Sequence, residues 1–251
     1  MSAPTVWGEG ERVVLVHGSL ATGPEEWLEQ RPLADEGFEL VVPTRRAYAT
    51  SGTGEDFLRD GEDVAELLGD GAHLVGHSSG GLAALVASRL RPTAIRSLVL
   101  AEPPLFAVAA DHPAVARMVE ALKRLLESDV DDRTFLERFL TAVGTPELPP
   151  GLLARLEELA PALRLGRHPW QGEVPVAHLA GAPFPTVAVS GRHDEAFHAV
   201  CLALTRDHGA QLRVVEGSGH EVQLAGEPFN AVLRELWRAS PARSGTSPVL
   251  R

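Results

Sequence analysis

Short apolar runs alternate along the chain with longer stretches whose apolar residues recur at helical spacing. The apolar runs lie at residues 12–18, 38–43, 72–76, 95–104, 184–191 and 211–217. Because they are apolar throughout and do not alternate with polar residues, they predict strands of a sheet that is covered on both faces. The helical patterns between them predict parallel strands joined by right-handed crossovers. The predicted fold class is therefore α/β, with a mostly parallel, doubly wound sheet.

One long segment, residues 103–183, interrupts this alternation. A loop of that length without structure is rare in a compact domain. Its helical patterns lie at residues 112–128, 132–144 and 149–166. We therefore predict a helical cap inserted into a core domain made of residues 1–102 and 184–239. Residues 240–251 are rich in Ser, Pro and Gly and are predicted to form a flexible C-terminal tail.

A serine lies at the junction of the third predicted strand and the helix that follows it. The sequence there is GHSSGG, in which Gly76, Ser78 and Gly80 fit the pattern G-x-S-x-G. Glycines two residues before and two after the serine remove side chains that would crowd a sharp turn. A turn of this kind between a strand and a helix is a nucleophile elbow, and it predicts an exposed, reactive Ser78.

A serine hydroxyl needs a base to remove its proton and a further group to orient that base. The chain order typical of this elbow is serine, acid, histidine. Asp194 follows the fifth predicted strand, and His220 follows the sixth. Both lie on loops at the edge where ligands bind to such sheets. We favour Asp194 as the acid and keep Glu102, which follows the fourth strand, as a possible alternative acid.

The oxyanion hole and the pocket are predicted from loops near the elbow. The backbone amide of Ser79, next to the nucleophile, and that of Ser19, after the first strand, are the expected donors, with Leu20 as runner-up. Tyr48, on the loop after the second strand, is placed with Leu20 in the substrate pocket. The predicted cap adds two more aromatic pocket residues, Phe106 and Trp170.

The histidines and the single cysteine offer no recognised metal-binding spacing, so no metal site and no cofactor are predicted. His17 and His77 are interpreted as buried hydrogen-bonding residues. His193 and His198 are the two candidate metal ligands, but no paired cysteine or H-x-x-x-H helix lies nearby.

Composition limits the class of partner. The chain has 251 residues, of which 44% are hydrophobic, and a formal net charge of −11. This charge disfavours nucleic acid and anionic membranes, so we expect a small-molecule substrate. The beginning of the chain lacks a signal-peptide pattern, and no apolar run has the ~20 residues of a membrane span. The expected location is the cytoplasm, and the sequence gives no oligomeric state.

The segments VVLVHGS, LVGHSSGG, VAVSGRHDEAF and EGSGHEVQL resemble the α/β-hydrolase fold superfamily. The resemblance implies a serine hydrolase with a triad of Ser78, Asp194 and His220. We expect cleavage of a carboxylic ester or thioester of a small to medium substrate through an acyl-enzyme. Two alternatives stay open: a cyclase, lyase or acyltransferase that uses the same triad, and a non-catalytic ligand receptor.

Two departures from the superfamily pattern bear on the shape of the molecule. The loop after the second strand has Thr44 where relatives often have an acid. The chain also starts almost directly at its first predicted strand, so we expect the usual leading hairpin to be short or missing and the sheet to be smaller.

Overall fold

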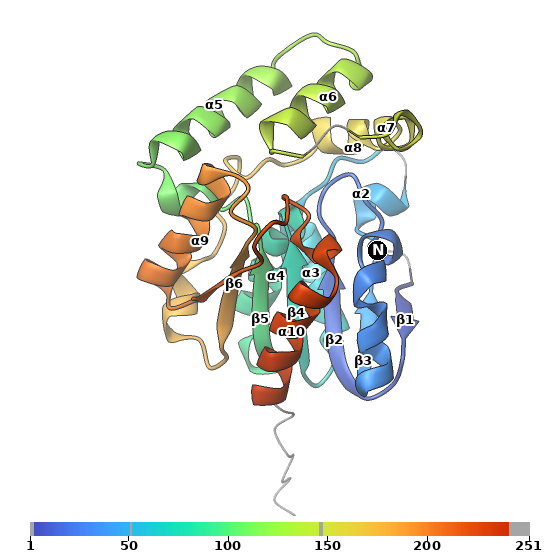
Figure 1. Cartoon of the computed structure of the whole chain (residues 1–251), viewed down its shortest axis with the longest axis vertical. Coiled ribbons are helices and arrows are strands. Elements are labelled where there is room, and N and C mark those ends of the chain that lie inside the picture. The colour runs from blue at the N-terminus through green and yellow to red at the C-terminus, as the bar shows by residue number, and fades with distance from the viewer. Residues whose placement is uncertain (1–2, 51, 146–147, 241–251) are drawn as a thin grey trace, which may run out of the picture.

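Residues 3–50, 52–145 and 148–240 are described by the computed structural model. In these residues one seven-stranded sheet has the order β1-β3-β2-β4-β5-β6-β7 (Figure 1). All neighbouring strands are parallel except β1 and β3. The strands are β1 (Thr5–Trp7), β2 (Glu11–Val16), β3 (Phe38–Val42), β4 (Ala72–His77), β5 (Ile95–Ala101), β6 (Thr186–Ser190) and β7 (Gln211–Val214). The predicted fold class is confirmed.

The six strands predicted from apolar runs are all present, and β1 is an addition. This three-residue strand pairs antiparallel with β3 at the edge of the sheet. This single short strand agrees with the expectation of a short or missing leading hairpin, and the expectation of a smaller sheet stays a prediction. A segment of three residues is too short to show a hydrophobic period, so only its pairing with β3 reveals it.

Helices cover both faces of the sheet. The longer ones are α3 (Phe57–Leu67), α4 (Ser79–Leu90), α9 (Glu195–His208) and α10 (Glu227–Ala239). The shorter elements of the core are α1 (Gly23–Glu26), α2 (Arg46–Ala49) and the 3-10 helices η1 (Leu28–Glu36), η2 (Pro92–Ala94) and η5 (Val222–Ala225). Side chains of α3, α4 and α9 form one buried cluster with the sheet, and those of η1 and α10 form a second. Successive strand residues such as Val13 and Val14 belong to different clusters because side chains alternate between faces.

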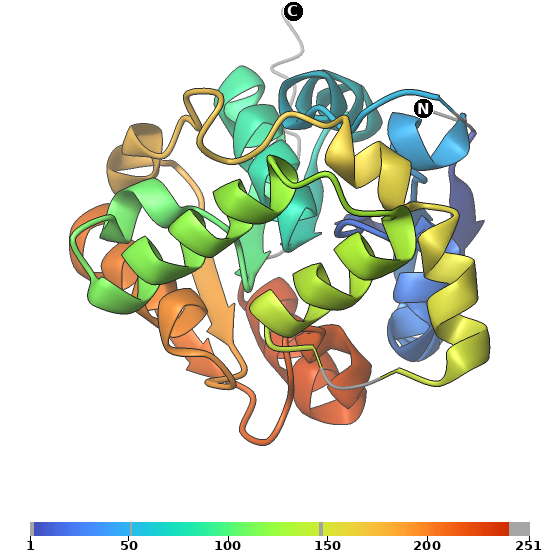
Figure 2. The ribbon, with the colours of Figure 1, turned by 90° about the horizontal axis from the view of Figure 1, so that it is seen from above.

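Further helices are inserted between β5 and β6. They are η3 (Phe106–Ala109), α5 (Pro113–Leu126), α6 (Asp132–Ala142), α7 (Pro150–Glu157), α8 (Ala160–Arg164) and η4 (Ala177–Gly181). In Figure 1, α5 to α8 lie above the ends of the strands, and Figure 2 shows α5 and α6 crossing over the sheet. The pattern at 149–166 forms two helices instead of one. Pro161 lies in the first turn of α8, where its missing N–H costs least.

The insertion agrees with the predicted cap, whose exact boundaries stay a prediction. Of the predicted tail, residues 241–251 lie outside the described residues.

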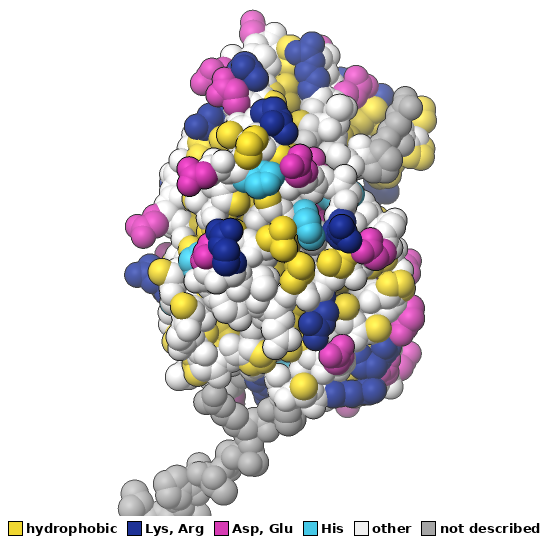
Figure 3. All heavy atoms as spheres, turned by 60° about the vertical axis from the view of Figure 1, so that its left-hand side comes forward, with side chains coloured by type: hydrophobic (Ala, Val, Ile, Leu, Met, Phe, Trp, Pro, Cys, Tyr) yellow, Lys and Arg dark blue, Asp and Glu magenta, His cyan; other side chains and the backbone are white. Residues whose placement is uncertain are grey.

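No helix in the described part of the chain has the length and apolar character needed to cross a bilayer. On the face shown in Figure 3, charged side chains of both signs are interspersed with scattered hydrophobic ones.

Candidate active site

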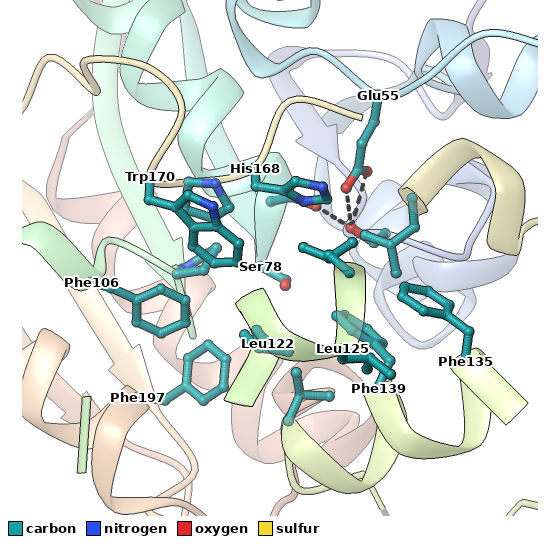
Figure 4. A pocket seen from close by; sticks show the side chains of 17 residues that line it. Glu55, Ser78, Phe106, Leu122, Leu125, Phe135, Phe139, His168, Trp170 and Phe197 are labelled. Atoms are coloured by element: carbon teal, nitrogen blue, oxygen red, sulfur yellow. Dashed lines mark hydrogen bonds between the residues drawn. The ribbon is translucent and has the colours of Figure 1, made fainter. Parts of the chain in front are cut away.

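Ser78 lies in a strained turn between β4 and α4. Its φ of 48° and ψ of −127° are values that few residues other than glycine adopt. The flanking glycines are required by close backbone contacts. A Cβ atom on Gly76 would lie 2.5 Å from the carbonyl oxygen of Gly80, and one on Gly80 would lie 2.4 Å from that of His17. The turn therefore has the geometry that the elbow motif predicts, and Figure 4 shows the Ser78 hydroxyl directed into a pocket.

His220 is in contact with this hydroxyl. Its Nε2 atom lies 3.0 Å from Ser78 Oγ, so a neutral imidazole can accept the serine proton. Burial lowers the pKa of His220 to about 3, and the charge of nearby His77 acts in the same direction. The imidazole is therefore neutral at neutral pH, which is the form that a general base requires.

A carboxyl oxygen of Glu102, the alternative acid, lies near the other ring nitrogen of the imidazole. Glu102 Oε2 lies 3.8 Å from His220 Nδ1, and Glu102 is fully buried. Its other oxygen accepts a 2.6 Å hydrogen bond from the backbone N–H of Gly191. Glu102 itself has a positive φ of 47°. Burial raises the pKa of Glu102, while the Gly191 N–H acts against that rise.

Asp194 caps the N-terminus of α9. Its Oδ1 atom accepts hydrogen bonds from the backbone N–H of Ala196, at 2.7 Å, and of Phe197, at 3.3 Å. This is the ordinary role of an aspartate at the first turn of a helix. The assignment of Asp194 as the triad acid stays a prediction, and the geometry favours the alternative, Glu102.

A second buried histidine holds the backbone of His220. His77 Nε2 donates to the carbonyl oxygen of His220 at 3.1 Å, and His77 Nδ1 lies 3.0 Å from Glu26. Both carboxylate oxygens of Glu26 also accept from the N–H of Gly18. Burial lowers the pKa of His77, but the Glu26 carboxylate outweighs it and raises the pKa overall. These contacts agree with the hydrogen-bonding role predicted for His77, whereas the role of Glu26 was not predicted.

The structure brings Ser19 and Ser79, the two predicted oxyanion residues, together beside Ser78. Their hydroxyl oxygens are 2.7 Å apart, and Ser19 Oγ donates to Glu55 at 2.9 Å. With Ser19 donating to Glu55, Ser79 is the donor to Ser19. Both serines line the pocket that contains Ser78. The role of their backbone amides as oxyanion donors stays a prediction.

A buried ion-pair network supports the serines. Arg45 is fully buried and pairs with Glu55 at 2.9 Å and with Asp60 at 3.0 Å. It also donates to the Ser79 hydroxyl, at 3.2 Å. The Tyr48 hydroxyl donates to Glu55 at 3.0 Å. Arg45 and both acids were not predicted because a charged residue is normally exposed, and only the tertiary structure shows that these are buried and paired.

An apolar pocket extends from Ser78 under the inserted helices (Figure 4). Its volume, open mouth included, is about 550 Å³. The polar part of its wall is formed by the three serines, Glu55 and His168. The apolar part consists of Pro104, Phe106, Leu122, Leu125, Leu126, Phe135, Phe139, Val143, Leu163, Pro169, Trp170 and Phe197. The predicted pocket residues Phe106 and Trp170 therefore line it.

A second pocket lies on the other side of the nucleophile and is wider, with a volume of about 1840 Å³, open mouth included. It shares Ser19, Ser78, Phe139 and Val143 with the first pocket. The predicted pocket residue Leu20 lines this second pocket. The nucleophile is thus flanked by a narrow apolar space and a wide, more polar one.

Three other residues named from the sequence, Tyr48, His17 and His198, make hydrogen bonds within the protein. Tyr48 lines neither of these two pockets and instead lies in the buried network around Glu55. His17 is fully buried, and its Nε2 atom accepts from the N–H of Arg45 at 2.8 Å. His198 contacts Ser190 Oγ at 3.0 Å.

Comparisons with known proteins agree with this architecture. A family model described as "Alpha/beta hydrolase family" matches residues 13–232. No curated protein matches the chain.

Solved structures of similar fold have low sequence identity. An esterase from Exiguobacterium antarcticum is 22% identical with a TM-score of 0.69, and the match covers 92% of this chain and 93% of the esterase. A putative epoxide hydrolase from Pseudomonas aeruginosa is 18% identical with a TM-score of 0.73, and the match covers 94% of this chain and 91% of the hydrolase. An N-acyl homoserine lactonase, solved with N-butanoyl homoserine, is 16% identical with a TM-score of 0.72, and the match covers 96% of this chain and 94% of the lactonase.

At these identities the solved structures show a common fold and no common substrate. The family model spans most of the chain, including the elbow and the loops that carry Glu102, Asp194 and His220. The chain belongs to the alpha/beta hydrolase family.

Proposed function

We propose that the protein is a serine hydrolase that cleaves a carboxylic ester or thioester through an acyl-enzyme on Ser78. The observation that carries this proposal is the 3.0 Å contact between Ser78 Oγ and His220 Nε2 at a strained turn. In this mechanism Ser78 attacks the carbonyl carbon as its proton passes to His220. The imidazolium then donates this proton to the leaving group, and a water molecule deprotonated by His220 releases the acid.

We assign the third position of the triad to Glu102. The positive charge that forms on His220 during attack needs a nearby carboxylate, and Glu102 Oε2 is the carboxylate oxygen opposite Nδ1. A fully buried carboxylate acts more strongly than an exposed one because little solvent screens it. The backbone N–H of Gly191 fixes the other oxygen of Glu102 and so orients the group.

Acyl transfer fits a serine nucleophile better than epoxide opening does. Attack of the Ser78 alkoxide on an epoxide carbon would form an ether, which water does not hydrolyse under mild conditions. Attack on an ester forms a new ester on Ser78, and a second attack by water cleaves it. Ser19 and Ser79 line the pocket together with Ser78, which supports the proposal that their backbone amides bind the oxyanion of an acyl intermediate.

The two pockets suggest where the two parts of the substrate, the acyl group and the leaving group, would bind. We place the acyl group in the narrow pocket, because its wall is mostly aromatic and aliphatic. The alcohol or thiol part then lies in the wide pocket, which also admits water to His220. This arrangement suits a small to medium acyl chain and tolerates varied leaving groups.

Fluorophosphonate labelling with peptide mapping tests the proposal. The expected result is one modified residue, Ser78, in the folded wild-type protein. Ser78→Ala should abolish both labelling and turnover of p-nitrophenyl esters. Ser128→Ala is the matched control, since Ser128 lies on the inserted segment and, among the described residues, its hydroxyl donates to the Leu125 carbonyl.

Isotopically labelled water then separates hydrolysis from the alternatives. Label in the carboxylate product supports hydrolysis, and an unlabelled product formed by transfer or cyclisation argues against it. Absence of both labelling and turnover, or labelling at another residue, would contradict the mechanism.

A further inference from the structure

Three buried ligand atoms converge behind the imidazole of His220. They are Oε2 of Glu102, Nδ1 of His193 and Nδ1 of His220, and all lie within 4.8 Å of one another. Glu102 Oε2 is 3.7 Å from His193 Nδ1 and 3.8 Å from His220 Nδ1. None of the three atoms has a hydrogen-bond partner among the described residues. Unpaired buried polar atoms are costly, so a shared ligand would be strongly favoured.

The remaining polar atoms of these side chains are already bonded, which leaves the three atoms available to a shared ligand. His193 Nε2 donates to the carbonyl oxygen of Val143 at 3.2 Å, so a neutral His193 has its lone pair on Nδ1. Glu102 Oε1 accepts from Gly191, and His220 Nε2 contacts Ser78. Metal-binding histidines are oriented in this way, with the second ring nitrogen bonded to a carbonyl or another fixed group.

We propose that Glu102, His193 and His220 form a binding site for a divalent metal ion of the zinc type. Two imidazole nitrogens and one carboxylate oxygen are a ligand set that Zn²⁺ favours. Ligands about 2.1 Å from one ion lie about 3.4–3.6 Å apart. The two distances from Glu102 therefore need to close by a few tenths of an ångström, and the two imidazole nitrogens, which lie within 4.8 Å of each other, approach as well. The three residues come from the loops after β5, β6 and β7, which meet at one edge of the sheet.

Metal bound here would inhibit the serine. Coordination through Nδ1 of His220 moves the single proton of the neutral imidazole to Nε2, which then donates to Ser78 and cannot accept from it. Glu102 is also withdrawn from its place opposite Nδ1. The inhibitory consequence depends on the function proposed above, whereas the metal site itself does not.

Metal binding is tested directly on the full-length, tag-free, metal-depleted protein. Titration with Zn²⁺ by calorimetry should give one tight site in the wild type. His193→Phe keeps a ring of similar size but removes a ligand, and the affinity should fall at least about 100-fold. His198→Phe is the matched control, because His198 lies in the same region but outside the cluster, and it should bind as wild type does. Equal binding by wild type and His193→Phe would overturn the proposal, as would no binding by the wild type.

Cobalt spectra and activity give independent readouts. Co²⁺ should produce visible absorption bands in the wild type and in His198→Phe but not in His193→Phe. If the protein turns over esters, Zn²⁺ should inhibit the wild type reversibly, and a chelator should restore it. Measured against its own metal-free rate, His193→Phe should resist Zn²⁺. Inhibition that is undiminished in His193→Phe would contradict the site, while absence of any turnover would bear only on the proposed function and leave the binding result to decide.

Discussion

Glu102 Oε2 lies 3.8 Å from Nδ1 of His220, on the side of the imidazole opposite Ser78. The carboxylate that completes the series of serine, histidine and acid therefore belongs to the residue after β5, just before the inserted helices. Since Glu102 directly follows β5, its position is fixed by a central strand of the sheet. This relationship leads to the first prediction.

Glu102→Gln should reduce kcat by roughly 10³- to 10⁴-fold, because the amide cannot offset the charge that forms on His220 and favours the wrong tautomer. Asp194→Asn is the matched comparison. Asparagine caps a helix as well as aspartate does, so this variant should keep kcat within about threefold and lose little stability. Ester kinetics and urea unfolding of both variants provide the check. A large loss in Asp194→Asn with near-normal activity in Glu102→Gln would restore Asp194 as the acid.

Substitutions of the two acids that pair with buried Arg45 should have similar effects on stability but different effects on kcat. Glu55→Gln should destabilise the fold by about 3 kcal/mol because Arg45 loses a buried partner. It should also lower kcat about tenfold, because Ser19 donates to this carboxylate and its backbone amide would shift. Asp60→Asn should cost similar stability but leave kcat almost unchanged, since Asp60 bonds to Arg45 and not to Ser19 or Ser79. Equal loss of kcat in both variants would argue against a link between Glu55 and the oxyanion residues.

The elbow glycines should differ sharply in tolerance. A methyl group on Gly80 meets two backbone carbonyl oxygens, of Val16 and His17, at 2.4 Å, so Gly80→Ala should destabilise the protein by about 1–3 kcal/mol. A methyl group on Gly81 meets Pro103 Cβ at 3.3 Å, and the gain in helix propensity there offsets much of that crowding. Urea unfolding curves of the two variants give the comparison, and similar midpoints would be inconsistent with this packing.

The narrow pocket should control acyl chain length. Leu122→Ala removes a side chain that lines it, and the preferred p-nitrophenyl ester should become longer. Each added methylene that becomes buried is worth about 0.8 kcal/mol, or about fourfold in kcat/KM. Leu152→Ala, which alters the wide pocket, should leave the preferred length unchanged. The opposite pattern would mean that the acyl group occupies the wide pocket.

An ion pair between Asp56 and Arg167 joins the core to the inserted segment. Asp56 caps α3 through the Leu58 N–H at 3.0 Å and accepts from Arg167 at 3.0 and 3.2 Å. Burial raises the pKa of Asp56, but the hydrogen bonds from Arg167 and Leu58 outweigh it and lower the pKa. Because the folded pKa is depressed, the stabilisation should be present above the unfolded pKa of about 3.9 and lost as the pH falls through the folded value.

Two variants separate the contributions of Asp56. Asp56→Asn keeps a helix cap but not the charge, so its destabilisation should vanish at low pH. Asp56→Ala should be less stable than Asp56→Asn by about 1 kcal/mol at every pH, because it also loses the cap. The check is the free energy of unfolding, measured against pH for both variants. A constant difference between wild type and Asp56→Asn would show that the charge contributes nothing.

The sequence by itself determined the six parallel strands of the sheet, the longer helices and the elbow. Strands that are buried on both faces must be apolar throughout, and amphipathic helices must repeat every 3.6 residues, so both leave a local pattern. The turn at Ser78 needs glycine at positions 76 and 80 for steric reasons that also act locally. Each of these features depends on residues that are close together in the sequence, so it can be predicted without coordinates.

Tertiary structure alone decided which carboxylate faces His220, and how Arg45, Glu55 and Asp60 are buried together. Glu102 and Asp194 both follow strands that end at the same edge of the sheet, so strand order alone left them equivalent. The choice depends on backbone direction: the positive φ of Glu102 is compatible with a carboxylate close to His220, while Asp194 begins a helix and bonds to its first amides. Contacts between residues far apart in the chain depend on the direction in which the backbone at each residue points its side chain. No local pattern of residue types encodes these directions.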